Sequence, residues 1–468
     1  MLDFSAFSGR KDFLKFFEAI SKIPRGSGNS SHIANYLEAF ARERGLFCVR
    51  DSYNNVLIKK RASKGYENAP AVILQGHTDM VIATNEKLTG NILKDGVSLY
   101  IDGEFLRGVG STLGADNGIA VAYMLAILDS DEKLPPIEAL FTSDEEIGLI
   151  GAGGFDTSIL SGKTLINIDA GYEGIFIAGC AGGEKIDIYS DFKAAAADSC
   201  YEISVSGLRG GHSGDKIHEG RLNAIKLMAE LAKGADMIGN IKGGSADNAI
   251  ANEVTFSVTG LDDIEKKIKD LLIKWQKTEK DIKVTAVKKE KKTSLIDKDG
   301  TKKLINLISS LPYGPTEMMK NKPSQVKTSA NLGIISSDGG RVNLTVSIRS
   351  SSDTSKAALE AHIISIADGI GARTECSGKY PGWEYKEISP LRDALNEAYT
   401  ELYNKTASTV TIHAGLECGI FASAINGLDC VSLGPSMYDI HTANERLSIP
   451  SAIRGYEFLI KALSKLKG

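Results

Sequence analysis

The chain of 468 residues lacks several features that would assign it to a common class of protein. No apolar run approaches the roughly 20 residues of a membrane span. The first residues, MLDFSAFSGRKDFLKFFEAI, lack the basic, apolar and small-residue parts of a secretory signal. The six cysteines include no CxxC pair, so we expect reduced, mostly buried thiols. The sequence therefore predicts a soluble cytoplasmic protein.

A surplus of charge of one sign is also absent. Lysine and arginine together number 55, and aspartate and glutamate 59, which gives a formal net charge of −4. A nearly neutral chain argues against binding of nucleic acid by a basic surface. Nucleotide binding has no support either, because no GxGxxG follows a predicted strand and no Walker sequence occurs. We expect neither nucleic acid nor a membrane as a partner.

Glycine, in contrast, is abundant. The chain has 48 glycines, about 10% of its residues against the usual ~7%. They do not repeat with a period of three, which excludes collagen and indicates many tight turns. The length exceeds the roughly 100–200 residues of an ordinary domain, so we expect two domains or one domain with a large insertion.

Two styles of hydrophobic pattern divide the chain. Short, nearly continuous apolar runs at residues 71–75, 138–142, 164–168 and 430–433 predict buried parallel strands. Helical patterns at residues 118–128 and 450–466 accompany them, which indicates a sheet covered on both faces. These two regions predict one discontinuous α/β domain, residues 1–183 and 386–468.

The middle of the chain, residues 184–385, has a different pattern. Apolar and polar residues alternate at Val254, Phe256 and Val258 and again at residues 342–348, as in antiparallel strands with one open face. Helical stretches at residues 221–233 and 262–276 would cover the other face. The lysine-rich residues 277–292 predict a solvated surface. We expect an inserted α+β domain.

Acidic and histidine side chains gather where the predicted strands end. The segments are QGHTD around His77 and Asp79, GADNG around Asp116, SDEE around Glu145 and Glu146, DAG at Asp169 and DIHT around His441. Sites in α/β proteins form at the carboxyl ends of strands. We therefore expect these side chains at one edge of the sheet.

This set of side chains suits two divalent metal ions. Zinc binds histidine nitrogen and carboxylate oxygen, and a pair of ions roughly 3.5–4 Å apart needs a bridging carboxylate. Asp79 is placed to orient His77. Of Glu145 and Glu146, one can bind metal while the other deprotonates the bridging water. Each segment alone has an ordinary structural explanation, such as a helix cap at Asp116, but their joint occurrence favours the metal site.

A resemblance to a known family rests on these same segments. GHTDMV, LGADNGIAVA, FTSDEEIGLIGA, INIDAG and DIHTANERLSIP resemble the zinc aminopeptidase and dipeptidase family that includes aminoacylases and carboxypeptidase G. More narrowly, GGHSGDKIHEGRLNAIKL, DNAIANE and HAGLECGIF resemble the Xaa-His dipeptidases, or aminoacyl-histidine dipeptidases. The resemblance covers nearly the whole chain. It implies a mixed-sheet, zinc-peptidase-like α/β catalytic domain with an inserted α+β lid domain.

The resemblance also implies a role for each residue of the site. One ion would be held by His77 and Asp169 and the other by Glu146 and His441, with Asp116 bridging the two. Glu145 would be the general base. The peptide bond between Asp116 and Asn117 is expected to be cis.

Four residues, three in the inserted domain and Gly415 in the second part of the catalytic domain, are expected as partners of the substrate. His212 would stabilise the oxyanion, and Arg349 would bind the terminal carboxylate, a task suited to guanidinium. Asn331 and the backbone of Gly415 would lie near the same pocket. His413 and Glu417 have the i, i+4 spacing of a helical metal pair, although a role near the substrate is favoured. His32, His218 and His362 are interpreted as structural or solvated.

The sequence thus predicts metal-dependent hydrolysis of dipeptides, with Xaa-His dipeptides such as β-alanyl-histidine as substrates. A hydroxide activated by two metals would attack, and Glu145 would act as the general base. Zinc is the expected metal, with manganese and cobalt as alternatives. The alternative functions are an N-acyl amino-acid deacylase or a carboxypeptidase with the same metal site, and a non-catalytic metal-binding scaffold. A homodimer is left open.

Overall fold

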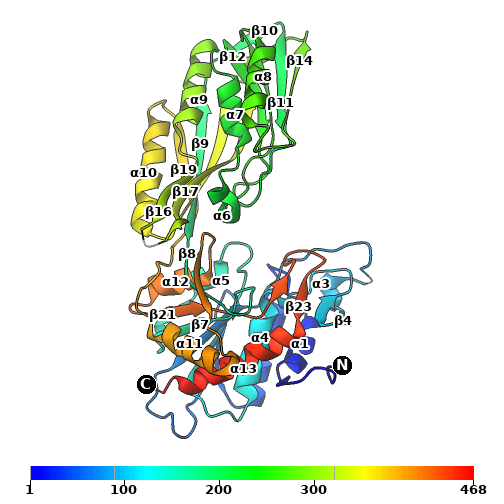
Figure 1. Cartoon of the computed structure of the whole chain (residues 1–468), viewed down its shortest axis with the longest axis vertical. Coiled ribbons are helices and arrows are strands. Elements are labelled where there is room, and N and C mark those ends of the chain that lie inside the picture. Colours follow the sequence, from blue (N-terminus) through cyan, green and yellow to red (C-terminus); the bar gives the residue numbers. More distant parts are fainter. Residues whose placement is uncertain (1, 89, 321, 468) are drawn as a thin grey trace. The chain divides into compact units, whose positions relative to one another are not determined.

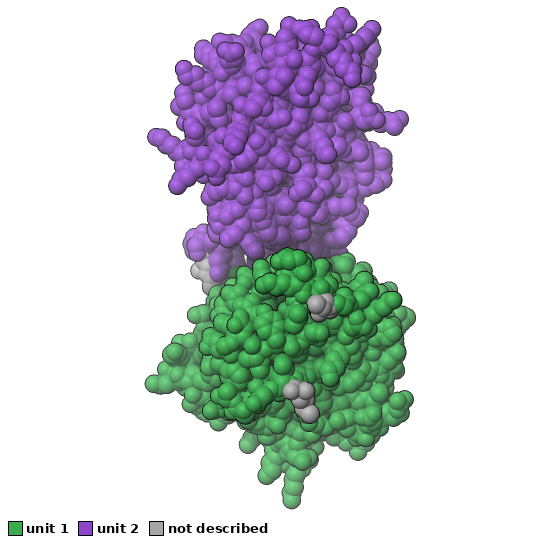
Figure 2. All heavy atoms as spheres, turned by 90° about the vertical axis from the view of Figure 1, so that its right-hand side faces the viewer, with its two compact units in different colours: residues 1–179, 385–411, 416–468 green, residues 180–384, 412–415 purple. Residues whose placement is uncertain are grey.

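The computed structural model describes residues 2–88, 90–320 and 322–467. The chain divides into two compact units, coloured separately in Figure 2. Unit 1 comprises residues 1–179, 385–411 and 416–468, and unit 2 comprises residues 180–384 and 412–415. Unit 1 is therefore built from both ends of the chain and unit 2 from its middle. The predicted assignment of a catalytic domain and a lid domain to these parts stays a prediction.

An eight-stranded mixed sheet forms the centre of unit 1 (Figure 1). In spatial order its strands are β1 (Phe47–Arg50), β2 (Val56–Lys60), β6 (Ile137–Thr142), β3 (Val72–His77), β7 (Thr164–Asn167), β21 (Asp429–Ser432), β8 (Ile175–Cys180) and β20 (Ser408–Ile412). The neighbours β6, β3, β7 and β21 run parallel. Every residue of β3 and β6 is buried, as their continuous apolar runs predict.

Helices and a small sheet complete unit 1. The helices are α1 (Leu14–Ser21), α2 (Ser31–Glu43), α3 (Ile92–Asp95), α4 (Ala115–Asp129), α5 (Ile150–Gly154), α11 (Pro390–Tyr403), α12 (Glu417–Ala424) and α13 (Ile449–Lys465), with a 3-10 turn η1 (Thr157–Ile159). The small sheet has the order β22 (Met437–Tyr438), β23 (Arg446–Ser448), β5 (Phe105–Gly108) and β4 (Leu99–Asp102). Helix α4 is buried all round from Asn117 to Leu128, which explains why its sequence is apolar on every face.

An antiparallel sheet of eleven strands forms unit 2. Along its main path lie β14 (Lys283–Lys289), β11 (Cys200–Ser206), β13 (Val254–Thr259), β12 (Met237–Gly243), β17 (Lys322–Asp338), β18 (Arg341–Ser350), β9 (Gly182–Asp191) and β19 (Arg373–Tyr380), and β10 (Ala194–Ala197), β15 (Thr293–Ile296) and β16 (Gly314–Met319) pair beside it. The helical segments are α6 (Ser213–Lys216), η2 (Ile217–Glu219), α7 (Ala224–Leu231), α8 (Ile264–Trp275), α9 (Lys298–Ser310) and α10 (Asp353–Asp368). Helices α7, α9 and α10 share one hydrophobic core with the sheet. The alternation predicted at residues 342–348 recurs as alternating burial along β18.

Several expectations about surface and thiols can be compared with the structure. The lysine-rich residues 277–292 contain strand β14, whose side chains are largely exposed at an edge of the sheet. The sequence predicted a solvated surface here but no strand. The exposed lysines, which discourage pairing with a further strand, make the alternation of apolar and polar residues hard to recognise. The six cysteines form no disulfide, and all are buried except Cys48, which is half-buried, and Cys376, which is exposed. In the part of the chain that the structure describes, every helix is too short or too polar to cross a bilayer.

Candidate metal centre and catalytic site

The predicted ligands come together at one edge of the unit 1 sheet. Residue His77 ends β3, Asp116 lies in the first turn of α4, Glu145 and Glu146 follow β6, Asp169 follows β7, and His441 lies between β22 and β23. Parallel strands place their carboxyl ends at a common edge. This explains why segments far apart in the sequence meet here.

Asp116 lies between two pairs of side chains. Its Oδ1 is 3.2 Å from Nε2 of His77, and its Oδ2 is 3.2 Å from Nε2 of His441. On the first side, His77 Nε2 is 3.7 Å from Oδ1 of Asp169. On the second side, His441 Nε2 is 2.8 Å from Oε1 of Glu146. One carboxylate thus presents a separate oxygen to each of two donor sets.

The donor atoms fit metal ions by distance and by chemistry. The sets His77, Asp116, Asp169 and Asp116, Glu146, His441 each have ligand atoms within 4.8 Å of one another. An ion about 2.0–2.2 Å from tetrahedral ligands needs ligand atoms about 3.3–3.6 Å apart. The separations of Asp116 and Asp169 from the imidazoles, 3.2 and 3.7 Å, lie within 0.1 Å of this range, whereas His441 and Glu146, 2.8 Å apart, are closer together. Histidine nitrogen with carboxylate oxygen is a donor set for zinc-like ions.

Asp79 connects His77 to the two adjacent glutamates. It is fully buried, and its carboxylate accepts hydrogen bonds from the backbone N–H of Glu145 (3.0 Å) and from the hydroxyl of Ser27 (2.7 Å). Nδ1 of His77 is 3.1 Å from the backbone oxygen of Asp79 and 3.4 Å from its carboxylate. The nearest acceptor for His77 is therefore the backbone of Asp79, and the carboxylate mainly holds the segment that carries Glu145.

Burial and neighbouring charges shift the pKa values of these groups. Burial raises the pKa of Glu145 to about 8, with Glu417, Glu146 and Asp116 adding to the rise and His77 opposing it. Burial acts against ionisation of Asp79 too, but hydrogen bonds and the charge of His77 lower the pKa of Asp79 to about 2. Hydrogen bonds to Asp116 and Glu146 raise the pKa of His441 to about 10. A carboxyl group whose pKa lies near neutrality is suited to proton transfer.

The residues predicted to contact substrate all lie in unit 2. Arg349 and Ser329 are cross-strand partners on β18 and β17. Arg349 donates from Nη1 to the hydroxyl of Tyr380 (3.0 Å), and Gly415 is so close to the same ring that a Cβ would lie 2.8 Å from it. Ser329 Oγ is 2.7 Å from Nε2 of His413. Arg349, Gly415 and His413 thus lie close together around Tyr380 and Ser329.

Asn331 and His212 occupy neighbouring positions of the same unit. The amide of Asn331 donates to the backbone oxygens of Asp247 (3.1 Å) and Ala249 (2.8 Å), which orients its Oδ1 away from them. His212 forms an isolated bridge with Ala249. Its side chain is 37% exposed, and its Nδ1 is 3.8 Å from the carboxylate of Asp215. The imidazole of His212 is therefore accessible to a ligand.

The alternative of a helical metal pair at His413 and Glu417 is wrong. Strand β20 ends at Ile412 and helix α12 begins at Glu417, so the two side chains do not share a helix. Glu417 is fully buried and accepts hydrogen bonds from Gln75 and from Thr142 (2.8 Å). Burial, with the charges of Arg349 and His218, lowers the pKa of His413 to about 3, which keeps its imidazole neutral.

Comparison with known proteins identifies the family. The sequence model of Peptidase family M20/M25/M40 matches residues 73–465, most of the chain and all of the predicted ligands. The chain belongs to this family. It is 34% identical over 471 aligned residues to the cytosol non-specific dipeptidase of Escherichia coli (strain K12), covering 96% of each chain.

Solved structures agree with this family assignment. The aminoacylhistidine dipeptidase of Vibrio alginolyticus matches with a TM-score of 0.88 and 34% identity, over 97% of this chain and 96% of that one. The aminopeptidase PepT of Bacillus cereus matches with a TM-score of 0.59 and 15% identity, over 98% of both chains, which shows a shared fold. The mixed α/β architecture predicted from sequence is thus confirmed as that of M20/M25/M40 peptidases.

Three residues that hold the segments of the candidate ligands were not found from sequence. Asn117 donates from Nδ2 to the carboxylate of Asp169 (2.8 Å), and the expected cis peptide between Asp116 and Asn117 is present. Arg25 and Glu445 bind the backbone around Asp116. Asn117 and Glu445 lie in the ADNG and DIHTANERLSIP segments, so their places in the motifs were visible although their partners were not.

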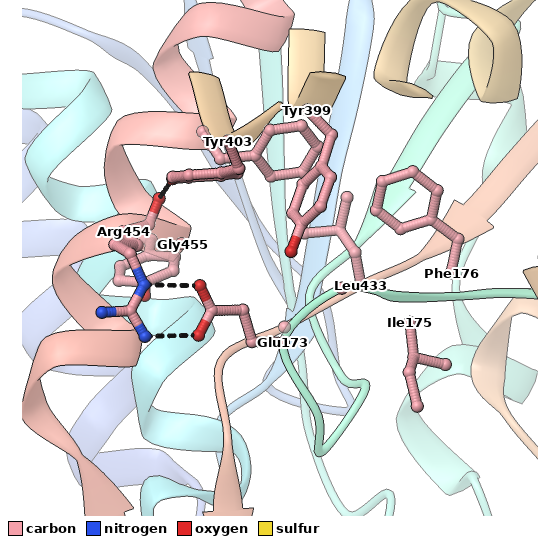
Figure 3. Close-up of a pocket in the computed structure, with 12 residues that line it drawn as sticks. Glu173, Ile175, Phe176, Tyr399, Tyr403, Leu433, Arg454 and Gly455 are labelled. Atoms are coloured by element: carbon pink, nitrogen blue, oxygen red, sulfur yellow. Dashed lines mark hydrogen bonds and ion pairs between the residues drawn. The ribbon is translucent and has the colours of Figure 1, made fainter. Parts of the chain in front are cut away.

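A small cavity of unit 1 is separate from the ligands of this peptidase. It lies beside α11 and α13 and is lined by aromatic rings, including those of Tyr399 and Phe176 (Figure 3). Arg454 forms two 2.7 Å bonds with the carboxylate of Glu173 at its rim. Its volume of about 10 Å³ has room for at most about one water molecule. It cannot hold a peptide, and its ion pair instead fastens the segment after Asp169 to α13.

Proposed function

We propose that this member of the M20/M25/M40 family is a metal-dependent dipeptidase that acts on Xaa-His dipeptides such as β-alanyl-histidine. One observation carries the proposal. Asp116 presents one oxygen to His77 and the other to His441, each at 3.2 Å, as a carboxylate that bridges two ions must. The names of the Vibrio alginolyticus and Escherichia coli relatives both support dipeptidase activity, and only that of the Vibrio alginolyticus protein supports Xaa-His substrates.

The proposed ligands are His77 and Asp169 for one ion and Glu146 and His441 for the other, with Asp116 shared. Divalent ions at these ligands would polarise the scissile carbonyl and make water a stronger acid. Zinc suits the donor set, and manganese and cobalt are the alternatives. Metal analysis of the purified protein tests this assignment, with two equivalents per chain expected.

Glu145 is proposed as the general base. It is half-buried, and its backbone is held by Asp79. It takes a proton from the attacking water and delivers it to the leaving amine. The pKa of Glu145, raised to about 8 by burial, would fall beside divalent ions, which favours the carboxylate form that accepts the proton.

Unit 2 is proposed as the lid domain that recognises the substrate. Arg349 Nε, Asn331 Oδ1 and His413 Nδ1 are buried and lack a hydrogen-bond partner among the described residues. Leaving such a group unpaired costs about 1–3 kcal/mol, so a ligand that pairs with it has a physical basis. Arg349 would bind the substrate carboxylate, Asn331 and Gly415 its backbone, and His212 the developing oxyanion.

A substrate panel on the zinc-loaded protein separates the alternatives. We expect hydrolysis of β-alanyl-histidine and other Xaa-His dipeptides, with a tripeptide and N-acetyl-histidine much slower. Fast release of histidine from N-acetyl-histidine would favour a deacylase. Fast removal of the C-terminal residue of the tripeptide would favour a carboxypeptidase. A protein that binds two equivalents of metal and hydrolyses nothing would be a scaffold.

Two further proposals follow from the relatives and the sequence. The name of the Escherichia coli relative places that protein in the cytosol, and we infer the same compartment here. A homodimer is the alternative to a monomer. Sedimentation of the purified chain decides between the two.

A further inference from the structure

Glu445 is a buried carboxylate at the joint between two ligand segments. It is 2% exposed and follows His441 by four residues. Its Oε2 accepts hydrogen bonds from the backbone N–H groups of Leu113 (2.8 Å) and Gly114 (2.9 Å), and its Oε1 accepts from those of Ala115 (2.8 Å) and Asp116 (3.2 Å). The carboxylate therefore binds the backbone of the bridging residue and of the three residues before it.

The N–H groups of Ala115 and Asp116 belong to the first turn of helix α4, and those of Leu113 and Gly114 precede it; the backbone at Asp116 and Asn117 departs from helical φ and ψ. The first N–H groups of a helix have no partner within it and attract negative charge. The N-cap residue Gly114 has φ of 69° and supplies no side-chain cap. A carboxylate offers only acceptors, so Glu445 satisfies all of these donors at once. The amide of a glutamine would instead direct N–H groups against N–H groups.

Arg25 holds the same turn from its other side. It donates from Nη2 to the backbone oxygen of Gly114 and from Nη1 to that of Thr78 (3.0 Å). Thr78 follows His77, so Arg25 ties the His77 segment to the turn. A Cβ at Gly114 would lie 2.5 Å from Nη2 of Arg25, so only glycine allows this approach. The turn thus has two independent attachments.

Glu445 links this turn to the loop that carries His441. Its own N–H donates to the backbone oxygen of Thr442 (3.1 Å), which closes the loop that carries His441. The residue His441 has φ of 62°, a left-handed conformation that costs about 1–2 kcal/mol and persists only where its surroundings hold it. Asp169 is held separately by Asn117. Loss of the Glu445 carboxylate would detach the His441 loop from the turn before Asp116, while Arg25 still holds that turn and Asn117 still holds Asp169.

We propose that Glu445 is a positioning residue that fixes His441 relative to the bridging Asp116 and so sets the affinity for the second metal ion. The inference rests on the proposed function, because it assumes that Glu146 and His441 bind an ion. It goes further in assigning the affinity of that one ion to a residue that does not touch it.

A matched control exists in the same unit. Glu138 is also 2% exposed, and its carboxylate accepts from the backbone N–H groups of Ser161 (3.0 Å) and Gly162 (3.0 Å) and from Lys59 (2.8 Å). The segment that it holds carries no proposed ligand. Glu138→Gln is therefore the same chemical change at a buried carboxylate that binds backbone.

The experiment is a Zn²⁺ titration of metal-free protein against a chelating indicator. We expect Glu445→Gln to bind the first equivalent as the wild type does and the second about 10–100-fold more weakly, the range for loss of a residue that supports a ligand. Glu138→Gln should bind both equivalents like the wild type. In a His441→Ala background, which retains one equivalent, adding Glu445→Gln should change nothing, since the two residues act on one ion.

The positioning role is overturned if Glu445→Gln binds both equivalents normally, weakens both equally, or still weakens the remaining ion in the His441→Ala background. Selective loss of the second equivalent in Glu138→Gln overturns it too. If Glu445→Gln does not fold, Glu445→Asp, a shorter carboxylate, replaces it with the same outcomes. A wild type that binds no Zn²⁺ contradicts the proposed function itself, whereas a wild type with two equivalents and an insensitive Glu445 contradicts only this inference.

Discussion

Replacement of Asp79 by asparagine separates two roles that its carboxylate combines in the structure. Oδ1 accepts from the backbone N–H of Glu145 at 3.0 Å, and Oδ2 accepts from the hydroxyl of Ser27 at 2.7 Å. Asparagine keeps one of these oxygens and replaces the other with an N–H₂ group. Oδ2 also accepts from the backbone N–H of Glu146 at 3.4 Å. One backbone hydrogen bond is therefore lost whichever way the amide turns, although the hydroxyl of Ser27 can accept from the new N–H₂ group. The shape of the side chain is otherwise preserved.

The size of the effect follows from these contacts. A hydrogen bond to a charged group contributes about 1.5–3 kcal/mol, and about 1.36 kcal/mol corresponds to a tenfold change in rate. If the anchor of Glu145 is lost, kcat should fall about 10–150-fold. His77 keeps its closest acceptor, the backbone oxygen of Asp79 at 3.1 Å. Zinc affinity should therefore fall less than about tenfold, below the usual cost of losing a residue that supports a ligand.

The measurement is kcat for a dipeptide at saturating zinc, together with a zinc titration of the same Asp79→Asn protein. Asp51→Asn is the control, because Asp51 Oδ1 also accepts from two backbone N–H groups, those of Tyr53 and Asn55, each at 2.9 Å. The control should lose some stability and keep its kcat. Loss of zinc affinity with normal turnover of the fully loaded Asp79→Asn protein would refute this reasoning, since it would mean that the carboxylate serves His77 instead.

Other predictions concern the base, the substrate, the core and the pH. Glu145→Gln should retain two zinc equivalents and lose about 10²–10⁴-fold in kcat; a rate near that of the wild type would refute its role. Arg349→Lys should raise KM for a dipeptide about tenfold or more and leave the KM of the matching dipeptide amide unchanged, since only the dipeptide has a free carboxylate. Phe13 is fully buried, with its ring centroid 4.9 Å from that of Tyr123 and 5.3 Å from that of Tyr456. Phe13→Ala should lower the free energy of unfolding, measured by urea denaturation, by about 3–5 kcal/mol. The pKa of Asp79 in the folded protein, about 2, lies below its ordinary value of 3.8. Ionised Asp79 therefore stabilises the folded state fully above pH 3.8, and this contribution is lost as the pH falls toward 2. The difference in unfolding free energy between metal-free wild type and Asp79→Asn should shrink over that interval.

Local patterns in the sequence predicted much of the fold. Strands β3 and β6 are buried on both faces, so most of their residues are apolar, and this made them recognisable although Gln75, His77 and Glu138 interrupt the runs. The edge strand β14 was not predicted, because its exposed lysines hide the alternation of apolar and polar residues. The meeting of the candidate metal ligands at one edge of the sheet could be predicted for a related reason. A parallel strand ends at the same edge as its neighbours, so a histidine or carboxylate just past each strand is brought together with the others.

The sequence by itself determined the composition of the proposed site, namely two histidines and a set of carboxylates in motifs shared with one peptidase family. Only the tertiary structure decided how that set is held. Arg25, Glu445 and Asp116 lie in three distant parts of the chain, yet Arg25 and Glu445 bind the same turn before Asp116 from opposite sides. The orphan N–H groups of a helix can be capped by any carboxylate that the fold delivers. No local pattern around residue 115 shows that the cap comes from residue 445, because that pairing exists only once the chain has folded.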